Sequence, residues 1–240
     1  MLYYYCNTGQ TGINKPHKFW GMFVNQSQFK AMRQHMVESQ LRTSDVNDPA
    51  ILGAMAQVPR EAYVPEARAS TAYMDRAIPL TEGRALNPPL TIGRLIVEAD
   101  LAPTDKVLLI GAASGYTADI VARLAAHVVA LEESAELAAR ARTHLDARDN
   151  ISLVEGPLNQ GAAAHAPYDV IIVDGAIEEL PAIIVTQLAP EGRVVAGIVD
   201  RAVTRLCYGV RVGERVAFNP FADMEAVPLP GFAKPKVFSF

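Results

Sequence analysis

Lys106-Val-Leu-Leu-Ile-Gly-Ala-Ala-Ser-Gly-Tyr116 is the stretch that decides the fold. Its apolar run, residues 107–110, predicts a buried strand, and the alanine-rich residues after the glycines predict a helix. Between them lies the turn Gly111-Ala112-Ala113-Ser114-Gly115. A helix that starts there aims its free N–H groups over the carboxyl edge of the strand, where α/β sheets bind ligands. The stretch therefore predicts a site for a nucleotide-type ligand, although a turn of this kind also occurs for tight packing alone.

A second strand with an acid at its end strengthens this prediction. His127-Val-Val-Ala-Leu-Glu132 follows the turn, and Glu132 lies at the position that commonly accepts hydrogen bonds from ribose hydroxyls. The alternative is that Glu132 only begins the next helix as an acidic first-turn residue. An NAD-binding Rossmann protein is a further alternative, but Ala113 occupies the second glycine position of the dinucleotide fingerprint. No lysine follows the turn as it would in a P-loop.

Composition excludes several classes of protein. With 240 residues, half of them hydrophobic, the chain can bury one substantial core. Its net charge of −4 and the absence of basic runs argue against a nucleic-acid partner. No apolar run is long enough to span a membrane, and Cys6 and Cys207 form neither a disulfide framework nor a metal-ligand spacing. We therefore expect a cytoplasmic protein, with a monomer favoured.

The order of elements predicts an α/β fold with a doubly wound, mostly parallel sheet. We expect a poorly ordered tail over residues 1–25, a helical, substrate-side region over 26–100, and a Rossmann-like domain over 101–240. The tail is polar and aperiodic, and a helix is expected to open at Asp48-Pro49. Beyond the opening motif, helices are expected at 134–146 and 177–188, and strands at 151–154, 169–174 and 192–197. Antiparallel edge strands are expected after residue 204, the last of them at 236–240.

Several short segments resemble one known family. They are Met36-Val-Glu-Ser-Gln-Leu, Val58-Pro-Arg-Glu-Ala-Tyr-Val-Pro65, Ala72-Tyr73-Met-Asp75, the turn with Ser114-Gly-Tyr116, Glu132, Ala166-Pro-Tyr-Asp-Val-Ile-Ile-Val173, and Gln187-Leu with Glu191-Gly192. In order and spacing they resemble the protein-L-isoaspartate O-methyltransferase family. The resemblance implies the Rossmann-like fold of class I methyltransferases, S-adenosylmethionine (SAM) as cofactor, and protein repair by methylation of isoaspartyl carboxylates. The implied partners are damaged proteins or peptides, or another small acid.

The resemblance also implies which residues form the site. The cofactor would lie on Gly111, Ala112, Ala113, Ser114 and Gly115, with Glu132 and Gly156 around it. Asp174 departs from the family pattern, but from the carboxyl end of a central strand it could receive the ammonium of the cofactor in place of a family acid. Arg60, Arg84 and Pro88 would meet the substrate, and no metal is expected. Asn87 stands where the family has a serine that orients the substrate, so Asn87 is the candidate catalytic residue. The alternative for Asn87 is a helix N-cap followed by Pro88 as the first helical residue, and Asp174 could likewise be only a cap or turn residue.

Departures from the family pattern keep a second function open. Leu109 replaces an acid, Ala113 replaces a glycine, and Pro157 replaces a second acid in a segment that contacts the adenine. Each lost hydrogen bond to a charged group is worth about 1.5–3 kcal/mol. The main hypothesis is a SAM-dependent methyltransferase; the alternative is a catalytically impaired module of the same family that binds SAM or isoaspartyl peptides.

Overall fold

The computed structural model describes residues 24–81, 83–201 and 203–234. Nearly all of the predicted tail, and the strand expected at 236–240, lie outside these residues. Within them no helix is long and apolar enough to cross a membrane.

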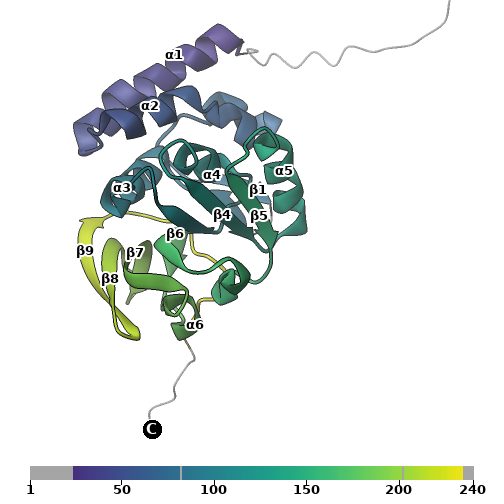
Figure 1. Ribbon diagram of the computed structural model, residues 1–240. Helices are drawn as coiled ribbons and strands as arrows, with labels where there is room; N and C mark the ends of the chain where they lie inside the picture. The colour runs from purple at the N-terminus through teal and green to yellow at the C-terminus, as the bar shows by residue number, and fades with distance from the viewer. Residues whose placement is uncertain (1–23, 82, 202, 235–240) are drawn as a thin grey trace, which may run out of the picture.

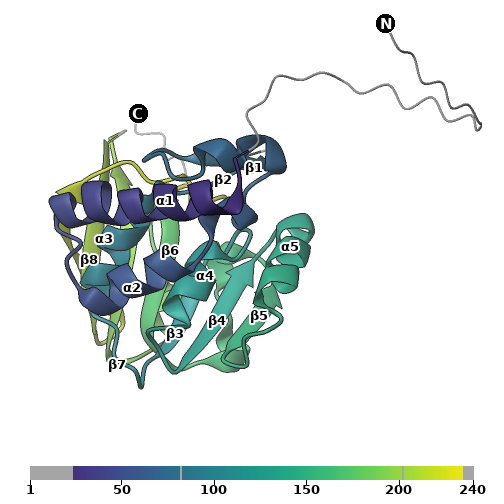
Figure 2. The same cartoon turned by 90° about the horizontal axis from the view of Figure 1, so that it is seen from above.

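Helical segments come first along the chain and lie on one side of the molecule (Figure 1). Asp48 accepts hydrogen bonds from the amides of Ala50 and Ile51, at 2.8 and 3.0 Å, which confirms the predicted helix start at Asp48-Pro49. Figure 2 shows α1 and α2 lying beside each other over the same face. The segments are α1 (Gln26–Met36), a π-helical turn (Val37–Leu41), α2 (Pro49–Gln57), and 3-10 turns at Arg42–Ser44, Arg60–Tyr63 and Glu66–Thr71.

A two-stranded hairpin leads into the next helix. It consists of β1 (Ile78–Thr81) and β2 (Arg84–Leu86), and α3 (Pro89–Ala99) follows. The predicted N-cap at Asn87 is wrong. Helix α3 begins one residue later, with Pro88 at the cap position and no side-chain cap. Asn87 instead turns its side chain into the interior, where buried partners from distant segments bind it.

Seven strands form the central sheet, in the order β5-β4-β3-β6-β7-β8-β9. The first five are mutually parallel, whereas β8 and β9 are antiparallel. The mostly parallel sheet with an antiparallel edge is thus confirmed. The strands are β3 (Lys106–Ile110), β4 (His127–Glu132), β5 (Ile151–Glu155), β6 (Tyr168–Ile177), β7 (Leu188–Asp200), β8 (Val203–Val212) and β9 (Arg215–Asp223).

The remaining helices connect these strands. They are α4 (Tyr116–Val121), α5 (Ala135–Leu145) and α6 (Ala182–Val185), with 3-10 turns at Leu158–Gln160 and Ala163–His165. Ser134 caps α5, which lies within the helix expected at 134–146. The helix expected over 177–188 is wrong in extent, because α6 is a single turn and β6 continues to Ile177. The Ala176 amide donates to the Val227 carbonyl at 2.8 Å, and the Leu229 amide donates to the Ala176 carbonyl at 2.9 Å, which holds the chain extended at Ala176.

Alternate residues of the strands face two different hydrophobic clusters, as a period of two requires. Leu109 belongs to a large cluster with side chains of α1 to α5. Leu108 and Ile110 face the other side, where they meet α6, Leu229 and Phe232. The carboxyl ends of β3, β4 and β6 therefore lie between a helical layer and the C-terminal segment.

Strand β9 forms one edge of the sheet. Its register against β8 shifts between Leu206 and Cys207, whose partners are Ala222 and Pro220. The outer strands are thus irregular near the end that carries Pro220.

Candidate cofactor and substrate site

The turn after β3 has the backbone shape of a ligand-binding loop. Gly111 and Gly115 have φ values of +83° and +98°, and Ala113 between them has +50°. The amides of Gly111 and Ala112 both donate to the carbonyl of Leu131 at 3.0 Å, which fastens the turn to the end of β4. Glycine adopts positive φ freely, whereas the Cβ of Ala113 makes this conformation costly.

Glu132 lies fully buried at the end of β4. Its carboxylate accepts from the amides of Ala113 (2.8 Å), Glu133 (3.0 Å) and Ser134 (2.9 Å). It also forms a bidentate ion pair with Arg84, through Nη1 to Oε1 and through Nη2 to Oε2, the latter at 2.9 Å. Arg84 is only 7% exposed, so the cation that was expected to meet substrate lies instead in an internal pair.

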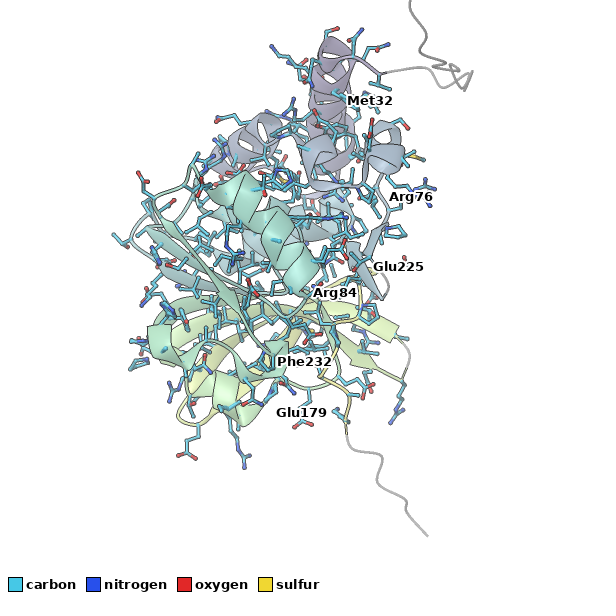
Figure 3. The ribbon with its side chains drawn as sticks, turned by 90° about the vertical axis from the view of Figure 1, so that its right-hand side faces the viewer. Met32, Arg76, Arg84, Glu179, Glu225 and Phe232 are labelled. Atoms are coloured by element: carbon cyan, nitrogen blue, oxygen red, sulfur yellow. The ribbon has the colours of Figure 1, made fainter. Side chains whose placement is uncertain are left out.

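An open hollow lies beside this ion pair. Its volume is about 580 Å³, and its lining includes Arg84, Ser134, Gly156, Pro157 and Pro230. Figure 3 shows Arg84 near one end of α5, on the same side of the molecule as Glu225 and Phe232. The predicted adenine-side residue Gly156 is therefore placed next to Glu132, with space in front of it.

Asn87 and Asp174 form the second centre of the site, and both are buried. The Asn87 amide nitrogen donates to Asp174 Oδ1 at 2.7 Å and to the Asp174 carbonyl at 3.0 Å. Thr117 donates its hydroxyl to Asp174 Oδ2 at 2.5 Å. Burial raises the pKa of the Asp174 carboxyl, although these hydrogen bonds and the nearby charges of Arg60 and Arg84 oppose the rise.

Arg60 binds the backbone of Asn87. Its guanidinium is fully buried and donates to the carbonyls of Ala72 and Asn87, at 2.7 and 2.5 Å. It also lies over the ring of Tyr116, 4.8 Å from the centroid. Burial lowers the pKa of the Arg60 guanidinium. Arg60 is thus placed to position Asn87 and has no exposed surface with which to meet a substrate.

The C-terminal segment completes the site. The Val227 amide donates to Asn87 Oδ1 at 2.7 Å. Leu229 lies against the turn, since a Cβ added to Gly111 would be 3.0 Å from Leu229 Cδ1. Thr117, Val227 and Leu229 were not predicted from the sequence. Pro228 and Pro230 indicate only that the segment is irregular, and Thr117 lies one residue after the stretch that ends at Tyr116.

Two other predicted positions serve the structure. Ser114 donates its hydroxyl to the Tyr63 carbonyl at 2.6 Å and is buried, as is Pro88. Within residues 24–81, 83–201 and 203–234, no group of three or more His, Cys, Asp or Glu side chains could hold a metal ion.

Comparison with known proteins assigns the family. A sequence model described as Protein-L-isoaspartate(D-aspartate) O-methyltransferase matches residues 31–230. The chain belongs to this family. A member from Koribacter versatilis is 36% identical over 205 residues, which are 85% of this chain and 92% of the relative. A member from Roseiflexus castenholzii is 37% identical over 205 residues, 85% and 94% of the two chains. Both carry the name protein-L-isoaspartate O-methyltransferase.

Solved structures of the same family share the fold. One protein-L-isoaspartate O-methyltransferase superposes with a TM-score of 0.72 at 23% identity, covering 83% of this chain and 66% of its own. Another, from Plasmodium falciparum and in complex with S-adenosyl-L-homocysteine, gives 0.69 at 20% identity and covers 81% and 96%. This family member therefore has a class I methyltransferase fold, and SAM is the methyl donor that the family implies.

In the conformation described, this isoaspartate methyltransferase relative does not present a fitting site for SAM. Glu132, the expected acceptor of ribose hydroxyls, is already saturated by Arg84 and backbone amides. Leu229 lies against Gly111, where a ligand would approach the backbone. The fold agrees with the family, while Leu229 and the Arg84 guanidinium lie over the turn.

Proposed function

We propose that this chain methylates the carboxylate of L-isoaspartyl residues, with SAM as donor, in the repair of damaged proteins. The observation that carries the proposal is the match to the family over residues 31–230. Damaged proteins or peptides as partners and a cytoplasmic location are part of the same proposal. The relatives carry enzyme names, which gives no support to a non-catalytic module over an enzyme.

Methyl transfer mainly requires that the acceptor carboxylate and the methyl donor are aligned. The acceptor carboxylate is ionised near neutral pH, and a sulfonium donor brings its own leaving group. The protein must therefore hold the carboxylate in line and keep water out. We propose that Asn87, whose side chain binds Asp174 and the Val227 amide, positions these segments around the substrate, and that Arg60 acts by holding the Asn87 backbone.

Asp174 has a supporting role in this proposal. A charged carboxylate beside Asn87 would repel an acidic substrate, and burial, by raising the pKa of Asp174, acts against that charge. The proposed cofactor contacts are Glu132, Gly156 and the turn from Gly111 to Gly115. Because the site as described does not fit SAM, no step through the donor follows from this conformation.

A methyl-transfer assay tests the function. The full chain is incubated with methyl-labelled SAM and either an isoaspartyl peptide or the same peptide with normal aspartate. We expect base-labile label on the isoaspartyl peptide only. Absence of label with both peptides, in a protein shown to bind SAM, would contradict the proposal. Equal label on both would assign a different acceptor.

A further inference from the structure

The carboxylate of Glu132 has more donors than it can serve. Arg84 donates through two nitrogens, and the amides of Ala113, Glu133 and Ser134 supply three more hydrogen bonds. A carboxylate offers about four lone-pair directions. Five donors leave none for a ribose hydroxyl, so a nucleoside can reach Glu132 only after a present donor leaves.

Arg84 is the only one of these donors that can leave without unfolding the turn. The three amides belong to the backbone of the β3–α4 turn and of the start of α5, whereas Arg84 reaches Glu132 through a long side chain from β2. The same guanidinium also covers the turn, since a Cβ added to Gly111 would lie 3.7 Å from Arg84 Nη2. Arg84 thus binds the carboxylate that would accept the ribose hydroxyls, and it also lies beside Gly111, where a ligand would approach the turn.

A neutral hydroxyl cannot displace such a cation easily. Bidentate hydrogen bonds between guanidinium and carboxylate are charge-assisted and geometrically matched, and this pair is buried, with relative exposures of 7% and 0%. The hollow of about 580 Å³ that Arg84 itself helps to line offers a place for the guanidinium to swing into water. The Arg84 guanidinium therefore has space beside it into which it can move away from Glu132.

We propose that Arg84 is an internal competitor for the cofactor: its ion pair with Glu132 closes the ribose end of the site, and a ribonucleoside ligand binds only when Arg84 has moved out. The apparent affinity is then the intrinsic affinity multiplied by the fraction of open molecules. The inference rests on the proposed function only for the choice of SAM and its product as ligands.

Binding by calorimetry tests the competition without any turnover. S-adenosylhomocysteine is titrated into the full-length wild type, Arg84→Gln and the control Arg193→Gln. Arg193 also pairs with a carboxylate, Asp105 at 2.7 Å, but it lies near the start of β3, at the opposite edge of the sheet. We expect affinity to rise at least about tenfold in Arg84→Gln and to change less than about twofold in Arg193→Gln. Equal affinity of wild type and Arg84→Gln would overturn the proposal.

The sugar hydroxyls give a second readout. Adenosine should gain affinity in Arg84→Gln as S-adenosylhomocysteine does, because Glu132 becomes free to accept from the ribose. 2′-Deoxyadenosine should gain clearly less. A gain of the same size for both nucleosides would overturn the assignment to Glu132.

Loss of a buried partner can also unfold a protein. If circular dichroism shows that Arg84→Gln is unfolded, Arg84→Lys replaces it, since lysine keeps the charge but cannot form the bidentate pair. Arg84→Lys should then show a smaller gain, and no gain would overturn the proposal. If Arg84→Gln binds S-adenosylhomocysteine tightly yet transfers no methyl group to isoaspartyl peptide, the proposed function fails while the competition stands.

Discussion

Ala113 carries backbone strain in the middle of the ligand-binding turn. Its φ of +50° lies in the left-handed region, where a Cβ costs about 1–2 kcal/mol. Ala113→Gly should therefore raise the free energy of unfolding by about 1 kcal/mol, measured by urea titration. Ala112→Gly is the matched control: Ala112 is not among the positive-φ residues, and this change should lower stability by a similar amount. A loss of stability in both variants would contradict the strain.

Asp174 should make stability depend on pH. Burial raises its pKa in the folded protein above the ordinary 3.8, so the folded state holds the proton more tightly than the unfolded state. The stability that this provides is full below the unfolded pKa and is lost as pH rises through the folded pKa. Asp174→Asn has no carboxyl to ionise, so the variant does not lose this stability as pH rises. The stability of the variant relative to wild type should thus be greater at about pH 7.5 than at about pH 3.5.

Urea midpoints at both pH values measure this difference. Thr117→Val serves as a comparison, because it removes one hydrogen bond to Asp174 and keeps the carboxyl. A relative stability of Asp174→Asn that is the same at both pH values would show that the carboxyl has an ordinary pKa.

At the scale of elements, Asn87 joins three segments that are distant in sequence. From the loop before α3 it binds Asp174 in the second half of β6 and Val227 in the C-terminal segment. Asn87→Ala removes the partner of Asp174 Oδ1, of the Asp174 carbonyl and of the partly buried Val227 amide, which should cost about 2–4 kcal/mol in unfolding free energy. Asn159→Ala is the control, since its hydrogen bond to Gly231 is exposed and should contribute less than about 1 kcal/mol. Equal losses would refute the role of Asn87 as a junction.

The elements that could be predicted from the sequence are those that depend on neighbouring residues rather than on distant partners. The strands β3 and β4 and the helix α5 were predicted correctly, because apolar runs and apolar periods are local signals. The helix over 177–188 failed at its start because Ala176 pairs with residues 227–229 and Ile177 with β7, and α6 begins only after Pro181. A prediction from helix propensity uses neighbouring residues only, so it does not include a pairing partner about fifty residues away.

The same reasoning explains the site. The turn and Glu132 were found from spacing, since both belong to one strand-turn-helix-strand unit. The pair of Arg84 with Glu132 joins residues 48 positions apart, and nothing in either segment marks the other. The sequence therefore indicated which residues lie near the carboxyl edge of the sheet, but not which of them form hydrogen bonds and ion pairs with each other.

At the scale of the whole molecule, the N-terminal helices and the sheet share one hydrophobic cluster. Met36 and Leu41 from the first helices belong with Val107 of β3 and Val170 of β6. The division at residue 100 stays a prediction, but this shared core should make the described chain unfold as one unit. Urea curves followed by far-UV circular dichroism and by tyrosine fluorescence should coincide. Two separated transitions would show that residues 26–100 unfold on their own.

Pro220 and the register shift beside it have a consequence for how the protein behaves when crowded or heated. An edge strand offers unpaired backbone groups to any other chain, and proline and bulges interrupt that template. The irregular stretch of β9 should thus protect this edge against cross-β growth. Pro220→Thr should shorten the lag of thioflavin-positive aggregation during mild heating, whereas Ala217→Thr, on the regular part of β9, should not. Equal lag times for both variants would mean that the proline does not guard the edge.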